Sequence, residues 1–199
     1  MKEIIPKTEA RKIVYERRRA IGEKEVRRKS QMIAEQLFLS DEVRSAKNIL
    51  FYASTLKGDI YTKSMIDNLI GMGKVISLPK LNKSQSRFFR GVFLGWDKTV
   101  VGEDLFIEST VAVDDNFDDI DLIIVPSVAV SLDGRRIGIG KEYYSNLISK
   151  TLAPRILLAF EFQVFNKIET TQKEFNVSKI ITERRIIPVN YSETYGKVR

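Results

Sequence analysis

The sequence predicts an α/β fold, a three-layer α/β/α sandwich with a mostly parallel central sheet. Apolar residues first recur at helical spacing and then gather in short runs of strand formers, so that helices and strands alternate along the chain. Residues 121–125 contain no polar side chain after the first, which is typical of a strand covered on both faces. A chain of 199 residues with 43% apolar side chains can build one core. We therefore expect a single domain over residues 1–199.

Two helical segments are predicted in the first fifth of the chain. Pro6 followed by Thr8 and Glu9 is typical of a helix start, and residues 10–20 contain no helix breaker. After a glycine, residues 23–39 again carry apolar side chains near helical spacing. The second segment is a separate helix or a continuation of the first.

A strand, a helix and a strand follow. Residues 48–53 are apolar and rich in strand formers, and residues 62–72 have a helical composition. Residues 74–78 predict a strand that ends at Pro79, because proline cannot donate to a strand ladder. Residues 87–94 predict another strand.

The second half begins with an acidic stretch, residues 103–121, which holds eight acidic residues and no basic one and is expected to be irregular and exposed. The buried strand that follows is closed by Pro126 and leads into a loop with several glycines. The remaining predictions are a helix over residues 142–152, a strand over 155–161 and one or two strands over 179–187.

Composition excludes several kinds of site. The chain has no cysteine and no histidine, so it has no disulfide, no Cys/His zinc site and no Ser-His-Asp triad. A bound metal would have to be a hard cation on oxygen ligands. Residues 1–19 have no apolar core between their charges, and the longest apolar runs are too short to span a bilayer. We expect a soluble, cytoplasmic protein without a membrane partner.

Basic charge is concentrated at the N-terminus, where residues 1–30 carry eleven basic and five acidic side chains. Such a segment is a nucleic-acid surface, a phosphate-binding site or a solvated helix face. Lys7 and Arg11 are spaced i, i+4, which places their Cβ atoms about 5–6 Å apart on one helix face. The pair can straddle a polyphosphate or simply face solvent.

The strongest local signal is the segment 125–144, where a buried strand runs into a glycine loop and then a helix. Ligands of open α/β sheets bind at the carboxyl ends of strands, and glycines there allow backbone N–H groups to approach an anion. Arg135, Arg136 and Lys141 add mobile positive charge to the loop. The spacing matches neither a Walker A loop nor a dinucleotide fingerprint. Phosphate binding and a plain turn are both open.

Ordered motifs over nearly the whole chain resemble the 5-formyltetrahydrofolate cyclo-ligase family, also called methenyltetrahydrofolate synthetase. The N-terminal Lys-x-x-x-Arg pair is matched by Lys7 and Arg11, the Glu-hydrophobic-Asp-Thr segment by residues 59–62, the Pro-Lys pair by Pro79 and Lys80, and the Val-Pro-Gly-hydrophobic-Ala strand end by residues 125–129. The family's Gly-x-Arg-Leu-Gly-Tyr-Gly-Gly-Gly-Tyr-Tyr-Asp run corresponds to residues 134–145, the Ala-Phe-x-x-Gln strand to Ala159, Phe160 and Gln163, and Ile-Ile-Thr-Glu to residues 180–183.

The resemblance implies a cyclo-ligase-like fold and an enzyme that uses ATP and Mg²⁺ to close 5-formyltetrahydrofolate, or a modified pterin, to its 5,10-methenyl form, releasing ADP and phosphate. It implies Arg136 and Lys141 as catalytic residues, and ATP binding by Lys7, Arg11, Arg136, Gly138, Ile139, Gly140, Lys141, Glu142, Tyr143 and Tyr144. Ser54, Asp59 and Tyr143 fall on the substrate side, and Glu174 is the candidate magnesium ligand. No nucleic-acid partner is expected, and the enzyme is a monomer or a homodimer.

Departures from the family pattern gather at these positions. Two glycines of the loop are Lys141 and Glu142, the aspartate after the double tyrosine is Ser145, and Asp59 stands at the family's glutamate. The alternative function is therefore a catalytically altered or inactive member that binds a nucleotide or a pterin as a regulator. A nucleic-acid-binding module built on the basic N-terminal segment is the third hypothesis.

Overall fold

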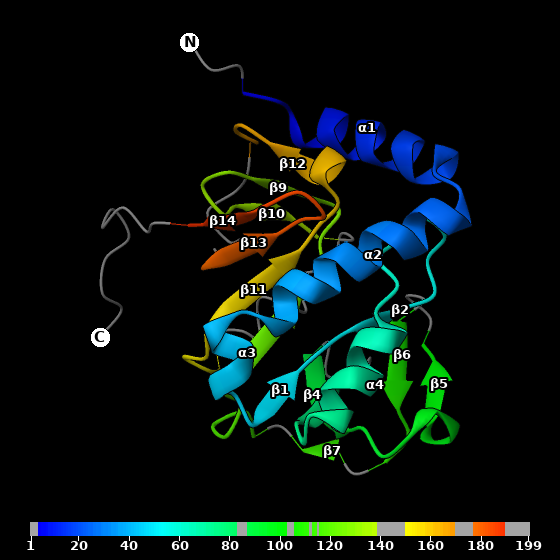
Figure 1. Cartoon of the computed structure of the whole chain (residues 1–199), viewed down its shortest axis with the longest axis vertical. Helices are drawn as coiled ribbons and strands as arrows, with labels where there is room; N and C mark the ends of the chain where they lie inside the picture. Colours follow the sequence, from blue (N-terminus) through cyan, green and yellow to red (C-terminus); the bar gives the residue numbers. More distant parts are fainter. Residues whose placement is uncertain are drawn as a thin grey trace.

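The computed structural model describes residues 4–82, 87–102, 106–111, 113–114, 116–138, 150–169 and 177–189 (Figure 1). Its helices are α1 (Lys7–Ala20), α2 (Glu23–Phe38), α3 (Asp41–Ser45) and α4 (Lys63–Gly71), with short 3-10 turns η1 (Trp96–Lys98) and η2 (Glu161–Gln163). Its strands are β1 (Asn48–Leu50), β2 (Ala53–Ser54), β3 (Val75–Asn82), β4 (Arg87–Val92), β5 (Thr99–Val101), β6 (Phe106–Ser109), β7 (Val113–Asp114), β8 (Leu122–Val125), β9 (Ala129–Ser131), β10 (Arg136–Ile137), β11 (Arg155–Leu158), β12 (Val164–Phe165), β13 (Lys179–Ile181) and β14 (Ile186–Pro188).

The largest sheet has the strand order β14-β13-β11-β8-β1-β3-β4-β7. Neighbouring strands from β13 to β3 run parallel, and β14, β4 and β7 add antiparallel pairs at the two sides. This confirms the α/β class with a mostly parallel centre. Two smaller sheets, β10-β9-β12 and β2-β6-β5, extend it.

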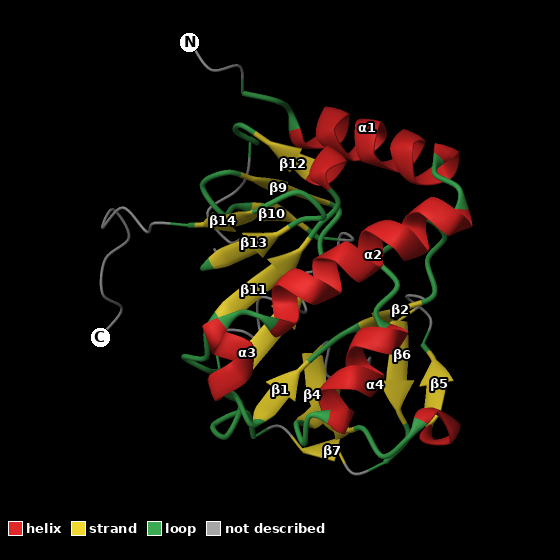
Figure 2. Cartoon of the chain, viewed as in Figure 1, coloured by secondary structure: helices red, strands yellow, loops and turns green. Residues whose placement is uncertain are grey.

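Alternate residues of the central strands face two different cores, as the two-residue period of a strand requires. Ile49 and Ile124 pack under α2 and α4, which Figure 2 shows crossing one face of the sheet. Leu50 and Ile123 point to the other face and pack with Phe117. The helix predicted over residues 142–152 falls almost wholly outside the described residues, so the second helical layer is not described.

α1 covers the small sheet β10-β9-β12 rather than the large one (Figure 1). Ala10 and Val14, four residues apart and fully buried, pack against Ala129, Ile137 and Ile168. This contact brings the basic first helix to the segments that follow β8.

The prediction that a strand ends at Pro79 is wrong, because β3 continues to Asn82. Phe93 N–H donates to Ile76 O, and hydrogen-bonded pairs alternate along an antiparallel ladder. Pro79, which lies opposite Arg90, is therefore in a non-hydrogen-bonded pair with β4. On the other side of β3, the pairing with β1 ends at Ser77. No ladder hydrogen bond therefore requires a backbone N–H at Pro79.

The acidic stretch is not uniformly irregular and exposed, contrary to expectation. It contributes β6, the middle strand of the sheet β2-β6-β5, and β7 at the edge of the large sheet. Phe117 and Ile120 are buried within it. The single strand expected over residues 48–53 is likewise divided into β1 and β2, which belong to different sheets. Both segments contain strand-forming apolar residues, but the local sequence does not indicate which strands they pair with.

One acid of this stretch, Asp121, ties the start of β8 to β1. Its Oδ2 accepts hydrogen bonds from the backbone N–H groups of Lys47 and Asn48, both at 2.8 Å. The bond from Asn48, followed by the bond from Lys47, lowers the pKa of Asp121 below its ordinary value. A carboxyl group whose pKa is lowered by folding stabilises the fold only while it is ionised.

Asp121→Asn is expected to lower the free energy of unfolding by about 1 kcal/mol or less at pH 7, because the carboxylate is exposed to solvent. The contribution is complete above the ordinary carboxyl pKa of about 4 and is lost as pH falls through the folded-state pKa. Urea unfolding at pH 7 and at about pH 2.5 should therefore show the difference only at pH 7. Asp118→Asn, an exposed acid nearby, is the control. An equal loss at both pH values would contradict the role of the charge.

No helix in the described part of the chain is long and apolar enough to span a membrane.

Candidate functional site

Several predicted site residues lie near the carboxyl ends of the parallel strands. β8 ends at Val125 and leads into Pro126 and Ser127, and β1 leads through β2 into the loop that carries Asp59. In open parallel sheets this edge is where ligands bind, because loops and helix ends from several strands meet there. α1 lies beyond this edge, beside β9 and β12 (Figure 1).

Two arginines from distant segments meet at Gly138. Arg11, on α1, donates from its NH2 nitrogen to the carbonyl oxygen of Gly138 at 2.9 Å. Arg136, on β10, lies so close to Gly138 that an added Cβ there would be 2.8 Å from its NH1 nitrogen. Lys7 lies one turn before Arg11 and is half-buried. The structure thus brings together the cationic ends of two predicted ATP-binding residues, with a third on the same helix face.

Arg136 is not the mobile surface charge that the loop composition predicted. It is only 6% exposed and donates from NH1 to Pro126 O at 3.2 Å. The segment between β9 and β10 is a tight turn, closed by Ser131 N–H donating to Arg135 O at 2.8 Å. Arg135 is half-buried beside Asp133, at 3.3 Å. Arg136 is therefore a fixed charge at the end of β8, suited to pre-organised binding of an anion.

A cavity of about 540 Å³ lies between the start of α2 and the β2–α4 loop, and Asp59 lines it. Its apolar wall is formed by Ile21, Val26, Ala53, Leu56, Ile60 and Ile107. A largely apolar cavity with a few fixed polar groups is typical of sites for small organic molecules. Ser54 follows the lining residue Ala53 in β2.

Arg27 and Tyr61 both line the cavity, and the Cζ of Arg27 lies over the Tyr61 ring, 4.5 Å from its centroid. Arg27 also donates to Glu23 from Nε and NH2, at 3.0 and 2.8 Å. The bond to Glu23, followed by the interaction with Tyr61, raises the pKa of Arg27 above its ordinary value. The cavity wall therefore contains a permanently charged arginine packed on an aromatic ring, as well as the acidic residues Glu23 and Asp59.

Arg18 connects the cavity to the end of β8. Its NH2 nitrogen donates to Asp59 Oδ1 and to Ser127 O, both at 3.0 Å. Arg18 is 5% exposed and Asp59 9%. Gln163 donates from Nε2 to Ser127 O at 3.0 Å and to Val128 O at 2.9 Å. These bonds form a buried polar network between Asp59 and the segment that holds Arg136.

Comparison with known proteins gives this arrangement a family. The model of the 5-formyltetrahydrofolate cyclo-ligase family matches residues 4–183. The chain belongs to this family. The resemblance of the motifs and the predicted fold are confirmed.

Individual relatives agree with this assignment. A probable 5-formyltetrahydrofolate cyclo-ligase of Schizosaccharomyces pombe is 32% identical over 122 residues, which are 59% of this chain and 59% of that protein. The 5-formyltetrahydrofolate cyclo-ligase of Mus musculus is 22% identical over 186 residues, covering 84% of this chain and 89% of the mouse protein.

Solved structures show the same fold. The NMR structure of Aquifex aeolicus 5,10-methenyltetrahydrofolate synthetase has a TM-score of 0.79 and 25% identity, covering 96% of this chain and 97% of its own. The 5,10-methenyltetrahydrofolate synthetase of Mycoplasma pneumoniae has a TM-score of 0.68 and 19% identity, and the match covers 88% of this chain and 98% of that protein. The second likeness supports the fold alone.

Within this cyclo-ligase family member, part of the predicted site lies outside the described residues. This group comprises Ile139, Gly140, Lys141, Glu142, Tyr143 and Tyr144, together with Glu174. Their predicted parts in ATP, substrate and magnesium binding therefore stay predictions. In the described residues, no three acidic side chains gather into a metal site.

The sequence analysis gave no site role to Arg18, Arg27 or Tyr61, although Tyr61 lies in the matched segment 59–62. For Arg18 a signal existed, because Ala10, Val14 and Arg18 recur every four residues and so lie on one face of α1. An arginine on an otherwise apolar face needs a buried partner. No comparable local signal placed Arg27 over Tyr61, since the two residues come from different elements.

Proposed function

We propose that this protein catalyses the ATP-dependent cyclisation of 5-formyltetrahydrofolate, or a related formyl pterin, to the 5,10-methenyl form, with release of ADP and phosphate. The observation that carries the proposal is the position of two predicted ligand sites side by side along one edge of the sheet. The arginines at Gly138 and the cavity at Asp59 are linked by Arg18, which bonds Asp59 and Ser127 O. Family membership supports the reaction type.

The reaction needs the formyl oxygen to attack the γ-phosphorus of ATP, which breaks the bond to ADP. The neighbouring folate nitrogen then attacks the formyl carbon and loses its proton, and the formyl oxygen leaves with phosphate. Little covalent chemistry falls to the protein, because positioning and charge neutralisation dominate phosphoryl transfer. Lys7, Arg11 and Arg136 would neutralise the triphosphate, and Lys141 would add a further cation.

On the folate side, Asp59 would accept hydrogen bonds from the pterin and so orient the formyl group toward the phosphate. Ser54 and Tyr143 are the other proposed contacts. The apolar wall of the cavity would exclude water, which strengthens the electrostatic interactions within it. Binding both substrates at one sheet edge brings the reacting atoms together.

Mg²⁺ would supply positive charge that neutralises the triphosphate. Glu174 is the proposed protein ligand, and the described residues offer no cluster of acidic side chains in its place. We further propose that the enzyme is cytoplasmic, a single domain over residues 1–199, a monomer or homodimer, and without a nucleic-acid partner.

The test is to mix the protein with Mg²⁺, ATP and 5-formyltetrahydrofolate and follow the absorbance of the methenyl product. We expect product only when ATP is present, with one ADP formed per product. A reaction without ATP would contradict a phosphorylated formyl group.

The substitutions Lys141, Glu142 and Ser145 at family positions favour one alternative, a family member that binds a nucleotide or pterin as a regulator. Calorimetry separates the two functions. ATP binding without product, under conditions in which a relative with the family's own loop is active, would support the regulator.

A further inference from the structure

We infer that Arg18 is a positioning residue for the substrate-side carboxylate of Asp59. This inference rests on the proposed function, because it assumes that the cavity at Asp59 receives the formyl pterin. Arg18 would act through Asp59 rather than by touching the substrate, since it is not among the residues that line the cavity.

The hydrogen bonds of Asp59 are divided unequally between its two oxygens. Oδ1 accepts from Arg18 NH2 at 3.0 Å and from Ile60 N–H at 2.9 Å. Within the described part of the chain, Oδ2 accepts no hydrogen bond, and Asp59 lines the cavity. One oxygen is thus held by the protein and the other is left to accept a bond from a ligand.

The same arginine fixes this carboxylate to the end of β8. Its NH2 nitrogen uses one hydrogen for Asp59 Oδ1 and the other for Ser127 O. Ser127 O is also bonded by Gln163 Nε2 at 3.0 Å, and Pro126 O by Arg136 NH1 at 3.2 Å. Two adjacent carbonyl groups therefore accept hydrogen bonds from Arg18, which binds Asp59, and from Arg136, which is one of the proposed phosphate-binding arginines.

The backbone adds a second contact between the same two segments. Gly58 has φ +73°, and a Cβ built on it would lie 2.2 Å from Arg18 O. The Gly58–Asp59 loop therefore packs directly against the backbone of the last turn of α1. Two contacts at one point restrict both the backbone and the carboxylate of Asp59.

Stability alone does not explain this ion pair. Arg18 uses one terminal nitrogen, not the bidentate geometry that gives the strongest arginine–carboxylate bonds. Its Nε is buried and has no partner among the described residues. Buried ion pairs can often be replaced by apolar residues without loss of stability. Orientation of Asp59 accounts for a pair that is buried but incompletely bonded.

The test is a double-substitution cycle of Arg18→Met and Asp59→Asn, measured as the Kd of 5-formyltetrahydrofolate without ATP, the Kd of ATP, and KM and kcat. We expect Arg18→Met to weaken folate binding and raise its KM about ten- to a hundredfold while ATP affinity changes less than about twofold. In the Asp59→Asn background the same substitution should add little, because its effect passes through the carboxylate. Arg18→Lys should recover part of the loss.

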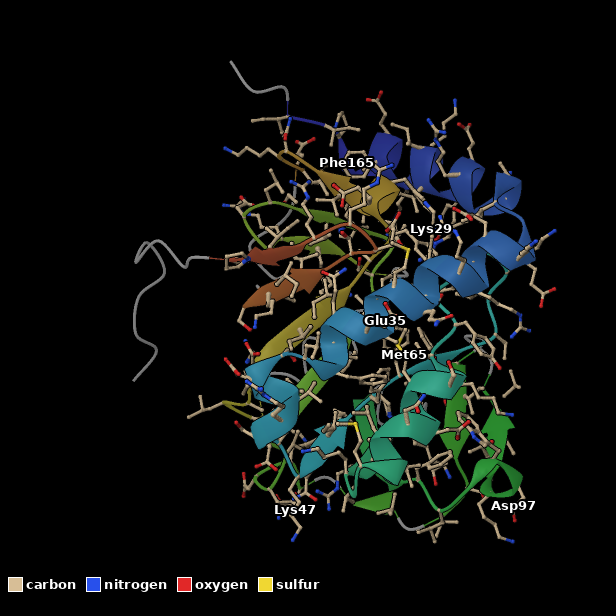
Figure 3. The ribbon with its side chains drawn as sticks, viewed as in Figure 1. Lys29, Glu35, Lys47, Met65, Asp97 and Phe165 are labelled. Carbon is tan, nitrogen blue, oxygen red and sulfur yellow. The ribbon has the colours of Figure 1, made fainter. Side chains whose placement is uncertain are left out.

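The matched control is Lys29→Met. Lys29, labelled on α2 in Figure 3, forms an ion pair with Glu183 at 2.8 Å that is also largely buried but does not line the cavity. The Lys29→Met substitution should lower the melting temperature and change the affinity for 5-formyltetrahydrofolate by less than about twofold.

A folded Arg18→Met protein with unchanged folate Kd and KM would overturn the inference, as would an equal loss in the Asp59→Asn background. If Arg18→Met alone does not fold, Arg18→Lys and the double variant, which leaves no unpaired buried charge, decide in its place. An unsubstituted protein that neither binds nor cyclises the folate would instead overturn the proposed function, and the part assigned to Arg18 with it.

Discussion

Arg136→Ala is expected to weaken ATP binding about ten- to a hundredfold, which corresponds to the loss of one or two charge-assisted hydrogen bonds. The guanidinium is fixed before ATP arrives, since it is buried and bonded to Pro126 O at 3.2 Å. A pre-organised charge contributes more to phosphate binding than a mobile one. Isothermal calorimetry with ATP measures the loss.

The same substitution should also lower the free energy of unfolding, by about 1–3 kcal/mol, because it leaves a buried carbonyl without this donor. If Arg136 were an exposed charge on the glycine loop, its removal would leave the free energy of unfolding nearly unchanged. Lys7→Ala, at a half-buried helix position, should weaken ATP binding with less change in melting temperature. Arg135→Ala, the neighbouring arginine beside Asp133, should leave ATP affinity within about twofold. Lower stability of Arg136→Ala with unchanged ATP affinity would show that Arg136 is structural only.

Gly58→Ala adds only one methyl group, but we expect it to lower the free energy of unfolding by about 2–5 kcal/mol. A positive φ costs an L-residue about 1–2 kcal/mol, and an overlap with neighbouring atoms adds about 1–3 kcal/mol. The atom in the way is Arg18 O, only 2.2 Å from the added Cβ, and a backbone oxygen cannot rotate aside. Thermal unfolding should show a decrease of about 5–15 °C.

Two other glycines separate the contributions. Gly73 has φ +78° but no atom within 4 Å of an added Cβ, so Gly73→Ala should show only the cost of the backbone conformation. Gly71, in the last turn of α4, has neither constraint, and Gly71→Ala should be neutral or stabilising by up to about 1 kcal/mol. If Gly58→Ala cost no more than Gly73→Ala, the contact with Arg18 would be looser than the structure indicates. Because the loop carries Asp59, Gly58→Ala should also weaken binding of 5-formyltetrahydrofolate.

Local patterns determined the secondary structure well where one element carries its own signal. The helices α1, α2 and α4 and the strands β4 and β8 lie where periodicity, composition and breakers predicted them. The strand predicted over residues 155–161 begins at Arg155 as expected, but β11 ends at Leu158 and the 3-10 turn η2 begins at Glu161. These signals are local because a helix or strand shows its buried face within a few residues. Pro79 and β6 were misjudged because both depend on the neighbouring strand, which local sequence does not specify.

The candidate site divides in the same way. The ordered motifs identified the family, and with it Lys7, Arg11, Asp59, Arg136 and Gly138, as well as the residues outside the described part of the chain. Residue type and spacing alone left two alternatives open, a solvated helix face for Lys7 and Arg11 and a plain turn for the glycine loop.

The sequence by itself therefore determined the fold class, the position of most elements and the family. Only the tertiary structure decided which charges are buried and what they hold. Arg18 meets Asp59 across 41 positions of sequence and Ser127 across 109, and Arg11 meets Gly138 across 127. Within a basic run of sequence, an arginine that will be buried cannot be told from one that will be exposed. The partner that offsets the desolvation of a buried arginine comes from a distant segment, which only folding brings into contact.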